Sequence, residues 1–259
     1  MQGEPRQIIV CLDSHDLSRR AATQFVELAN RSVAERGRFT VCLSGGSTPR
    51  ETYSLLAGEP FCNQAPWSSI HIFWGDERFI PLHDPNNHYR LATGLFLSKV
   101  PIPPENIHRM RVDHGNPSQV AFEYETSLKS FFKLSADEFP VFDLIILGMG
   151  ADGHMASLFP GTPALQEMKR VVTENYVPKL SADRLTLTLP TLNRARQIMF
   201  LVSGAQKADA LKQVLEGRDD GDYLPAQLLN PNGGQIKWMI DRDAASRVQS
   251  STLSGSWEN

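Results

Sequence analysis

The stretch FDLIILGMGADGH, residues 142–154, joins an almost wholly apolar segment to a glycine-rich loop that ends in a histidine. A short apolar run followed by glycines is typical of a strand that is buried on both faces of a parallel sheet. In such sheets the residues that follow the strands converge on one crevice. We therefore expect binding or catalytic groups in the loop at 148–154.

Apolar segments alternate with amphipathic segments along nearly the whole chain, outward from this stretch in both directions. Strands are predicted at 8–12, 39–43, 70–74, near 107–110, and at 142–147, 170–173, 184–189, 198–202 and 236–240, and helices at 17–35, 49–57, 88–100, 117–132 and 206–216. This order predicts an α/β fold with a mostly parallel sheet and helices on both faces. We expect one domain over 1–259, with its core at about 8–245 and a frayed tail at about 250–259.

Composition argues against several classes of partner. Lys and Arg total 26 against 29 Asp and Glu, so the formal charge of −3 provides no general field for nucleic acid or an anionic membrane. Residues 1–10 lack the apolar core of a secretory signal, and no apolar run reaches membrane-spanning length. Cys11, Cys42 and Cys62 show no metal or disulfide spacing. We expect buried thiols in a cytoplasmic protein with no nucleic-acid or membrane partner.

The segment SGGST at 44–48 follows one predicted strand and precedes Pro49, which suits the first turn of a helix. Glycines allow a ligand to approach the backbone, and a helix start offers unpaired N–H groups, so the segment can cradle a phosphate. An ordinary glycine turn with a capping hydroxyl explains the same letters equally well.

Three consecutive charges, Asp76, Glu77 and Arg78, follow the strand predicted at 70–74. A solvated loop is the plainer interpretation. The loop continues through His83, Asp84, Asn86, Asn87 and His88, however, and such a density of hydrogen-bonding groups suits a polyhydroxylated ligand.

Gly148, Gly150 and Gly153 match a dinucleotide-binding pattern, with Glu174 near the position of a ribose-binding acid. Against a nicotinamide enzyme, the loop lies late in the chain and 160–161 interrupts the long helix that this pattern requires. His154 beside Asp152 suits a general acid or base, because the pKa of an unperturbed imidazole lies near neutrality. A histidine that only bonds a backbone carbonyl remains the alternative.

Arg184 and Lys207 stand at the start of a predicted strand and a predicted helix. Each alone is typical of a surface charge. Together with the loop at 44–48 they can clamp a dianionic phosphate, because charge-assisted hydrogen bonds in a shielded crevice are stronger than neutral ones.

Five segments together resemble one family: LSGGSTP at 43–49, GDERFIP at 75–81, GMGADGHMASLFPG at 148–161, RLTLTLPTLN at 184–193 and SGAQKADAL at 203–211. In order and spacing, from about residue 8 to 245, the chain is similar to the glucosamine-6-phosphate isomerase/6-phosphogluconolactonase family. The resemblance implies a single Rossmann-like domain that hydrolyses 6-phosphogluconolactone to 6-phosphogluconate in the pentose phosphate pathway. It implies no metal or organic cofactor, and a monomer or small homo-oligomer.

The resemblance also implies roles for particular residues. Its phosphate loop falls on Gly45, Gly46, Ser47 and Thr48, its cationic partners on Arg184 and Lys207, its other substrate contacts on Arg78 and Asn87, and its catalytic histidine on His154. We add Asp76 to the predicted substrate contacts and Asp152 to the predicted catalytic residues. Asn86 departs from the serine usual in the family. In this hypothesis His154 moves a proton from water to the ring oxygen, Asp152 orients it, and Arg78 or backbone N–H groups offset the charge on the carbonyl oxygen.

Two other functions stay open at this point. The related deaminases carry an acidic residue at the position of Phe159 and a tyrosine at that of Arg78, so this chain departs from both features. A sugar-phosphate sensor that binds without turnover is the second alternative, and it leaves His154 and Asp152 unexplained.

Overall fold

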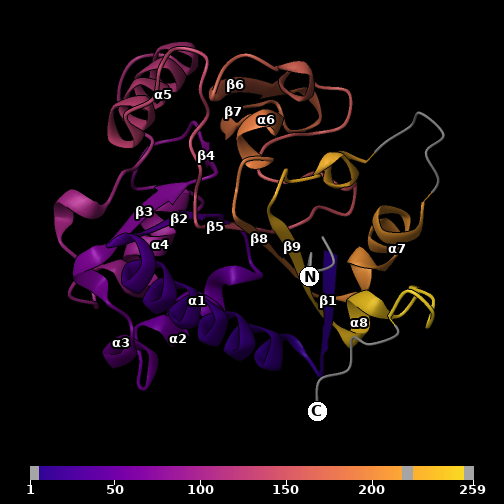
Figure 1. Ribbon diagram of the computed structural model, residues 1–259. Coiled ribbons are helices and arrows are strands. Elements are labelled where there is room, and N and C mark those ends of the chain that lie inside the picture. The colour runs from indigo at the N-terminus through magenta and orange to yellow at the C-terminus, as the bar shows by residue number, and fades with distance from the viewer. Residues whose placement is uncertain (1–5, 218–223, 254–259) are drawn as a thin grey trace.

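The computed structural model describes residues 6–217 and 224–253 and contains two sheets (Figure 1). The larger sheet has six parallel strands in the order β1-β9-β8-β5-β2-β3. Their bounds are β1 Arg6–Cys11, β2 Phe39–Leu43, β3 Ile70–Trp74, β5 Leu144–Leu147, β8 Gln197–Val202 and β9 Gln235–Asp241. The predicted α/β architecture with a mostly parallel sheet is confirmed.

Helices lie on both sides of this sheet in the view of Figure 1, with α1, α2 and α3 below it and α5 and α6 above it. Their bounds are α1 Ser14–Arg36, α2 Pro49–Leu56, α3 Phe61–Gln64, α4 His88–Ala92, α5 Pro117–Phe132, α6 Leu189–Leu192, α7 Ala208–Glu216 and α8 Arg242–Ala245. The sequence explains where α1 begins and ends: Asp13 accepts a bond from the Asp16 N–H, and Gly37 adopts φ 76°. The helix predicted at 88–100 is α4 followed by a π-helical segment, Thr93–Leu97.

The second sheet is antiparallel and has the order β4-β7-β6, with β4 Asp76–Arg78, β7 Ala182–Leu187 and β6 Val172–Val177. This corrects three predictions. The charged segment at 76–78 is a strand rather than a loop, the strands predicted at 170–173 and 184–189 form a hairpin outside the parallel sheet, and the strand near 107–110 is reduced to one bridge between Ile72 and Ile107. The three polar residues of β4 show no alternation of apolar and polar side chains, so the sequence gives no sign of a strand. The segment is a strand because it pairs with β7.

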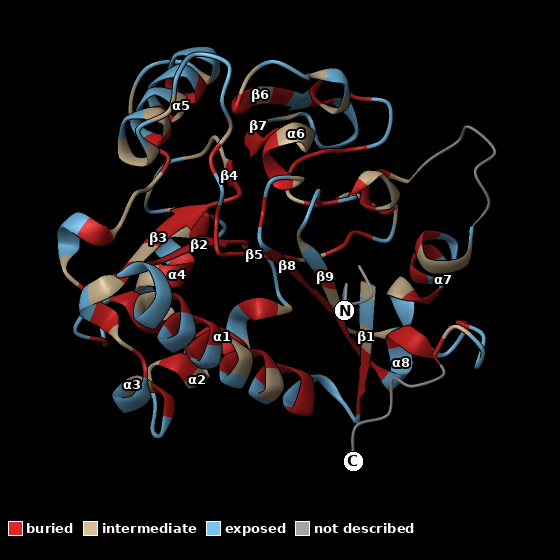
Figure 2. Ribbon diagram, in the orientation of Figure 1, coloured by how far each residue is buried: buried red, intermediate tan, exposed pale blue. Residues whose placement is uncertain are grey.

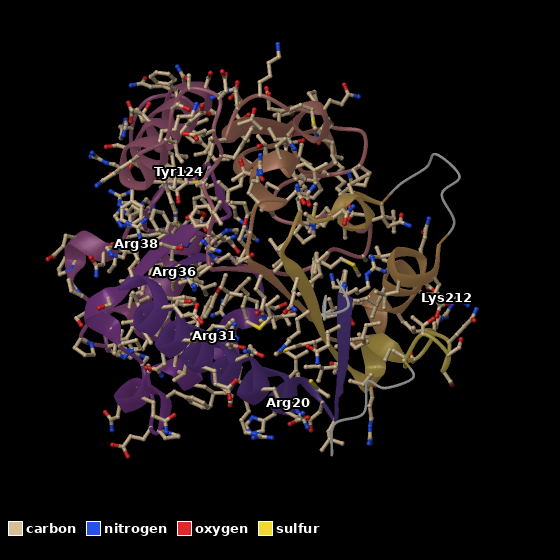
Figure 3. All side chains as sticks on the ribbon, in the orientation of Figure 1. Arg20, Arg31, Arg36, Arg38, Tyr124 and Lys212 are labelled. Atoms are coloured by element: carbon tan, nitrogen blue, oxygen red, sulfur yellow. The ribbon has the colours of Figure 1, made fainter. Side chains whose placement is uncertain are left out.

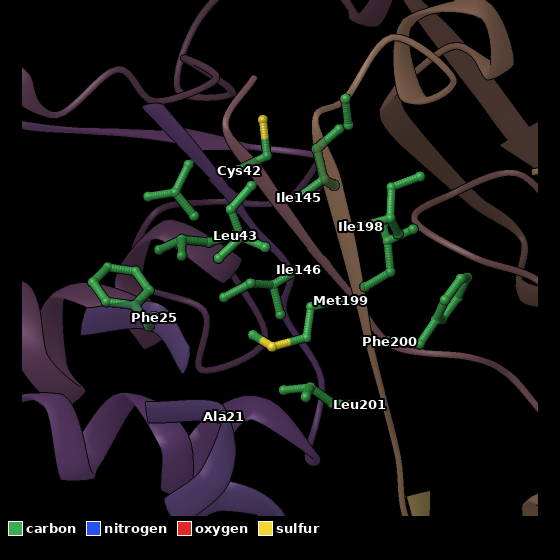
Figure 4. Packing of buried hydrophobic residues seen from close by; sticks show 14 of the residues in the cluster. Ala21, Phe25, Cys42, Leu43, Ile145, Ile146, Ile198, Met199, Phe200 and Leu201 are labelled. Atoms are coloured by element: carbon green, nitrogen blue, oxygen red, sulfur yellow. The ribbon is translucent and has the colours of Figure 1, made fainter. Parts of the chain in front are cut away.

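The core lies along the central strands, which Figure 2 shows as continuously buried. Figure 4 shows Leu43, Ile146 and Met199, from β2, β5 and β8, packed toward Phe25 and Ala21 of α1. A fully buried aliphatic side chain contributes about 1.5–3 kcal/mol relative to an exposed one. The ends of these strands are therefore fixed points from which loops can position side chains.

Tyr124 of α5, labelled in Figure 3, fixes the end of β3. Its hydroxyl accepts a 3.0 Å bond from the Trp74 N–H, and it lies 3.3 Å from the carbonyl oxygens of Trp74 and His108. This contact lies directly before Gly75 and the strand β4, so α5 holds the point where the chain passes from one sheet to the other.

Three further predictions concern the cysteines, the tail and the membrane. Cys11 and Cys42 are buried, whereas Cys62 is only partly buried. Of the tail, 254–259 lies outside the described residues; within 250–253, Leu253 is buried against the core. In the ranges that the structure covers, no helix combines the length and apolar character needed to cross a bilayer.

Candidate active site

Loops from four neighbouring strands of the parallel sheet, β3, β2, β5 and β8, line one cavity of about 330 Å³. The chain leaves β2 toward β3 on one side and leaves β5 toward β8 on the other, so the cavity lies at the point where the strand order reverses. Its wall includes Gly45, Gly46, Ser47, Thr48, Asp76, Arg78, His154, Arg184 and Lys207. All the residues predicted for the site therefore meet in this wall except Asp152 and Asn87.

The glycine loop after β2 is held from behind and open in front. The Ser44 hydroxyl donates a 2.6 Å bond to the Ile146 carbonyl of β5, and the Tyr53 hydroxyl donates a 2.7 Å bond to the Ser44 carbonyl. Gly46 adopts φ 90°, a conformation that favours glycine. Thr48 precedes α2 without a side-chain capping bond. The loop therefore presents a helix start and an uncommitted hydroxyl to the cavity, as an anion site requires.

His88, which the sequence placed only within a polar loop suited to a polyhydroxylated ligand, is also a member of this wall. Its ring covers Gly45 so closely that a Cβ on that glycine would lie 1.9 Å from the His88 Cδ2 atom. The ring Nδ1 lies 3.1 Å from the Asp76 carbonyl oxygen. The absence of a side chain at 45 is therefore a packing requirement, and no local sequence signal reveals the distant partner.

Three cations from separate elements face the cavity. Arg78 of β4 and Arg184 of β7 are direct partners in the strand register, and Lys207 follows β8. Neither guanidinium Nε has a hydrogen-bond partner, and no carboxylate of the described residues lies within 4.0 Å of these three cations. Burial lowers the pKa of Arg184 and of Lys207. Like charges placed opposite each other are destabilising, so this cluster is suited to receive an anion.

His154 lies in the loop after β5, and its ring bonds a carboxylate rather than a backbone carbonyl. The His154 Nδ1 is 2.5 Å from Asp152 Oδ1. Burial lowers the pKa of His154 to about 4, Lys207 and Arg184 act in the same direction, and Asp76 opposes them. The imidazole is therefore neutral at pH 7. A carboxylate only accepts hydrogen bonds, so Nδ1 carries the proton and Nε2 keeps its lone pair.

Two contacts fix the plane of this imidazole. The ring stacks on Phe159, with 4.0 Å between centroids and 24° between planes. A Cβ on Gly150 would lie 2.0 Å from His154 Nδ1 and 2.4 Å from Asp152 Oδ1. The glycine at 150 thus makes room for the histidine–aspartate pair.

Asp76 and Glu77 of the charged segment 76–78 have different roles. Asp76 faces the cavity, and its Oδ2 accepts a 2.8 Å bond from the Ser157 hydroxyl. Glu77 is buried and accepts bonds from the N–H groups of Arg78, His88 and Tyr89. Burial raises the pKa of Glu77, and these bonds oppose the rise. Glu77 therefore holds the backbone and does not face a ligand.

Asn87 and Glu174 do not reach the wall of the cavity. Asn87 is fully buried, and its Oδ1 accepts a 2.9 Å bond from the Arg90 N–H as the N-cap of α4. An asparagine before a helix is a capping signal that the sequence already contains. Glu174 pairs with Arg170 at 3.0 Å on β6, and turns rather than a long helix follow the glycines at 148–153. The dinucleotide pattern therefore has no matching structural context.

The chain is similar to known proteins over most of its length. The family described as Glucosamine-6-phosphate isomerases/6-phosphogluconolactonase matches residues 12–238. The chain is 40% identical over 243 residues to a 6-phosphogluconolactonase of Synechocystis sp., covering 94% of this chain and 98% of that protein. It is 37% identical to a probable chloroplastic 6-phosphogluconolactonase 4 of Oryza sativa, covering 94% of this chain and 77% of the rice protein.

The chain also has the same fold as solved structures of similar proteins. The 6-phosphogluconolactonase from Trypanosoma brucei superposes with a TM-score of 0.83 at 27% identity, covering 94% of this chain and 99% of that one. A monomeric glucosamine-6-phosphate deaminase, with a TM-score of 0.77 and 23% identity, covers 93% of this chain and 99% of its own and shares the fold.

Proposed function

The chain belongs to the Glucosamine-6-phosphate isomerases/6-phosphogluconolactonase family, and from this premise we propose that it hydrolyses 6-phospho-D-glucono-1,5-lactone to 6-phospho-D-gluconate. One observation supports this proposal above all. A neutral imidazole backed by a carboxylate shares a cavity with three cations that form no ion pair with a carboxylate within residues 6–217 and 224–253. A sugar phosphate with a reactive carbonyl at the far end from its phosphate has the matching chemistry.

The substrate's phosphate is assigned to the loop at 45–48 together with Arg184 and Lys207. Charge-assisted bonds from a guanidinium and an ammonium suit a dianion, and the start of α2 adds backbone N–H groups and the positive end of its dipole. Holding the phosphate fixes the opposite end of the sugar near His154, so part of the barrier is overcome by positioning.

His154 is assigned as the general base and then the general acid. Its Nε2 takes a proton from water as the water oxygen attacks the lactone carbonyl carbon, forming a tetrahedral oxyanion. The ester bond to the ring oxygen then breaks, and the same Nε2 returns the proton to that oxygen. Asp152 holds the Nδ1 proton and stabilises the transient imidazolium, while Arg78 is placed to offset the oxyanion.

The test is acid release from freshly prepared 6-phosphogluconolactone, corrected for spontaneous ring opening. His154→Ala is expected to lower kcat by on the order of 10²-fold or more. His114→Ala, a surface change outside the cavity wall, is the matched control and should keep the parental rate. Near-normal turnover by His154→Ala would reject the assigned role. Ammonia release from glucosamine 6-phosphate would instead indicate a deaminase, and tight binding of phosphogluconate without hydrolysis would indicate a sensor.

Compartment, assembly and domain number complete the proposal. We place the enzyme in the cytoplasm, because its three cysteines are free thiols and two of them are buried. We expect a single domain, because one continuous hydrophobic cluster joins residues from β1 to Leu253. The residues assigned to catalysis and phosphate binding all come from this chain, and we expect a monomer or a small homo-oligomer.

A further inference from the structure

Lys179 closes a ring of four side chains, of which His154 is one. It lies in the 3₁₀ turn Pro178–Leu180, between β6 and β7. Its Nζ contacts Asp152 Oδ2, while Asp152 Oδ1 bonds His154 Nδ1 at 2.5 Å. The same Nζ lies 4.7 Å from the centroid of the Phe159 ring, on which His154 stacks. The hairpin turn thereby reaches over the loop at 148–154 and touches the group behind the imidazole.

We propose that Lys179 is a positioning residue that fixes Asp152 against His154 and offsets part of the carboxylate charge. The inference deepens the proposed hydrolysis and rests on His154 as its base. A carboxylate alone beside an imidazole favours the imidazolium, whereas an ammonium on the other carboxylate oxygen weakens that preference. Lys179 thus holds Asp152 in the position that orients the ring and weakens the pull of the carboxylate on the imidazole proton.

The charged and titratable groups that contact His154 or line its cavity come from several elements. They are Asp152 on its own loop, Lys179 on the hairpin turn, Asp76 and Arg78 on β4, His88 on α4, Arg184 on β7 and Lys207 after β8. Lys179 is distinguished among the cations by its contact with a carboxylate within this site. Removing it would leave that carboxylate to the imidazole alone.

A direct role in phosphate binding is the alternative for Lys179. Its neighbour Leu180 lines the cavity, whereas Lys179 does not belong to the wall and its ammonium is directed to Asp152. A phosphate ligand would affect substrate binding, and so KM, when removed. A positioning residue would affect kcat and the protonation of His154 instead.

The experiment uses the full chain with Lys179→Met and Lys179→Arg. The pKa of His154 is measured by NMR titration of its imidazole in the free protein, with His154→Ala identifying the signal. Lys179→Met should raise the pKa of His154 by about 0.5–1 unit, a modest shift because half of the Lys179 side chain is exposed (51%), whereas Lys179→Arg should restore the parental value. In steady-state assays Lys179→Met should lower kcat by about 3- to 10-fold and leave KM unchanged.

Three results would overturn the proposal: an unchanged His154 pKa in Lys179→Met, a rise in KM with kcat unchanged, or Lys179→Arg behaving like Lys179→Met. Lys179→Gln repeats the charge removal with a more polar side chain, should Lys179→Met unfold. The titration needs no substrate, so it is decided independently of the proposed lactonase activity.

Discussion

Replacing Gly150 with alanine tests whether the histidine–aspartate geometry carries the chemistry. The new Cβ would lie 2.0 Å from His154 Nδ1, where ordinary van der Waals contact begins at 3.4 Å. The imidazole would therefore have to move by about 1.4 Å, and misplacement by about 1 Å costs on the order of 10²-fold in rate. We expect kcat for lactone hydrolysis to fall by about that factor, equivalent to about 2.7 kcal/mol in the barrier.

Gly94→Ala is the matched control for this substitution. A Cβ at Gly94 meets nothing within 4 Å, and Gly94 lies outside the cavity wall. Both variants should keep a thermal unfolding midpoint within a few degrees of the parent, because His154 and Asp152 are partly exposed and can rotate away. Gly94→Ala should keep kcat within about threefold of the parent. If Gly150→Ala does the same, the position of the His154 imidazole does not limit catalysis.

The remaining predictions concern substrate affinity and acid stability. Arg184→Met should raise KM by about 10-fold or more in steady-state kinetics, since a charged hydrogen bond contributes about 1.5–3 kcal/mol. The substitution should not lower the thermal unfolding midpoint, because it removes one of two cations that face each other. An unchanged KM would contradict the role of Arg184 in binding the substrate's phosphate. Burial lowers the pKa of His108 and of His154 to about 4, below the unfolded value of 6.5. The free energy of unfolding should therefore be highest above pH 6.5 and decrease as the pH falls toward 4. The decrease should be smaller in His108→Phe. A thermal unfolding midpoint that does not change between pH 6.5 and pH 4 would refute this prediction.

Elements whose ends are set by nearby residues were predicted correctly from the sequence. The bounds of β2 and β3 are as predicted, because each is a compact apolar run. Those of α5 are also as predicted, because Asn116 and Pro117 mark its start. The loops after these strands inherit their positions from the sheet, so the convergence of residues 44–48 with His154 was also predictable.

Other features depend on partners that lie far away in the chain. The strand β4 has three polar residues and becomes a strand only by pairing with β7. Lys179 carries no local signal, since its role appears when the hairpin brings it to Asp152. Asn87 shows the converse, because its letters satisfy both a binding pattern and a helix cap. Its Oδ1 caps α4, whereas its Nδ2 has no hydrogen-bond partner among the described residues.

The pairing of β1 with β9 has a consequence for how the protein is made. In the part of the chain that the structure describes, β1 pairs only with β9, beginning with Arg6 opposite Ile236. The two paired strands are therefore about 230 residues apart in the chain, and β1 lacks this partner until the segment at 235–241 is available. Until then β8 remains an open edge that other chains can join. Chains that end before residue 235 should therefore expose the edge of β8 and be recognised by chaperones.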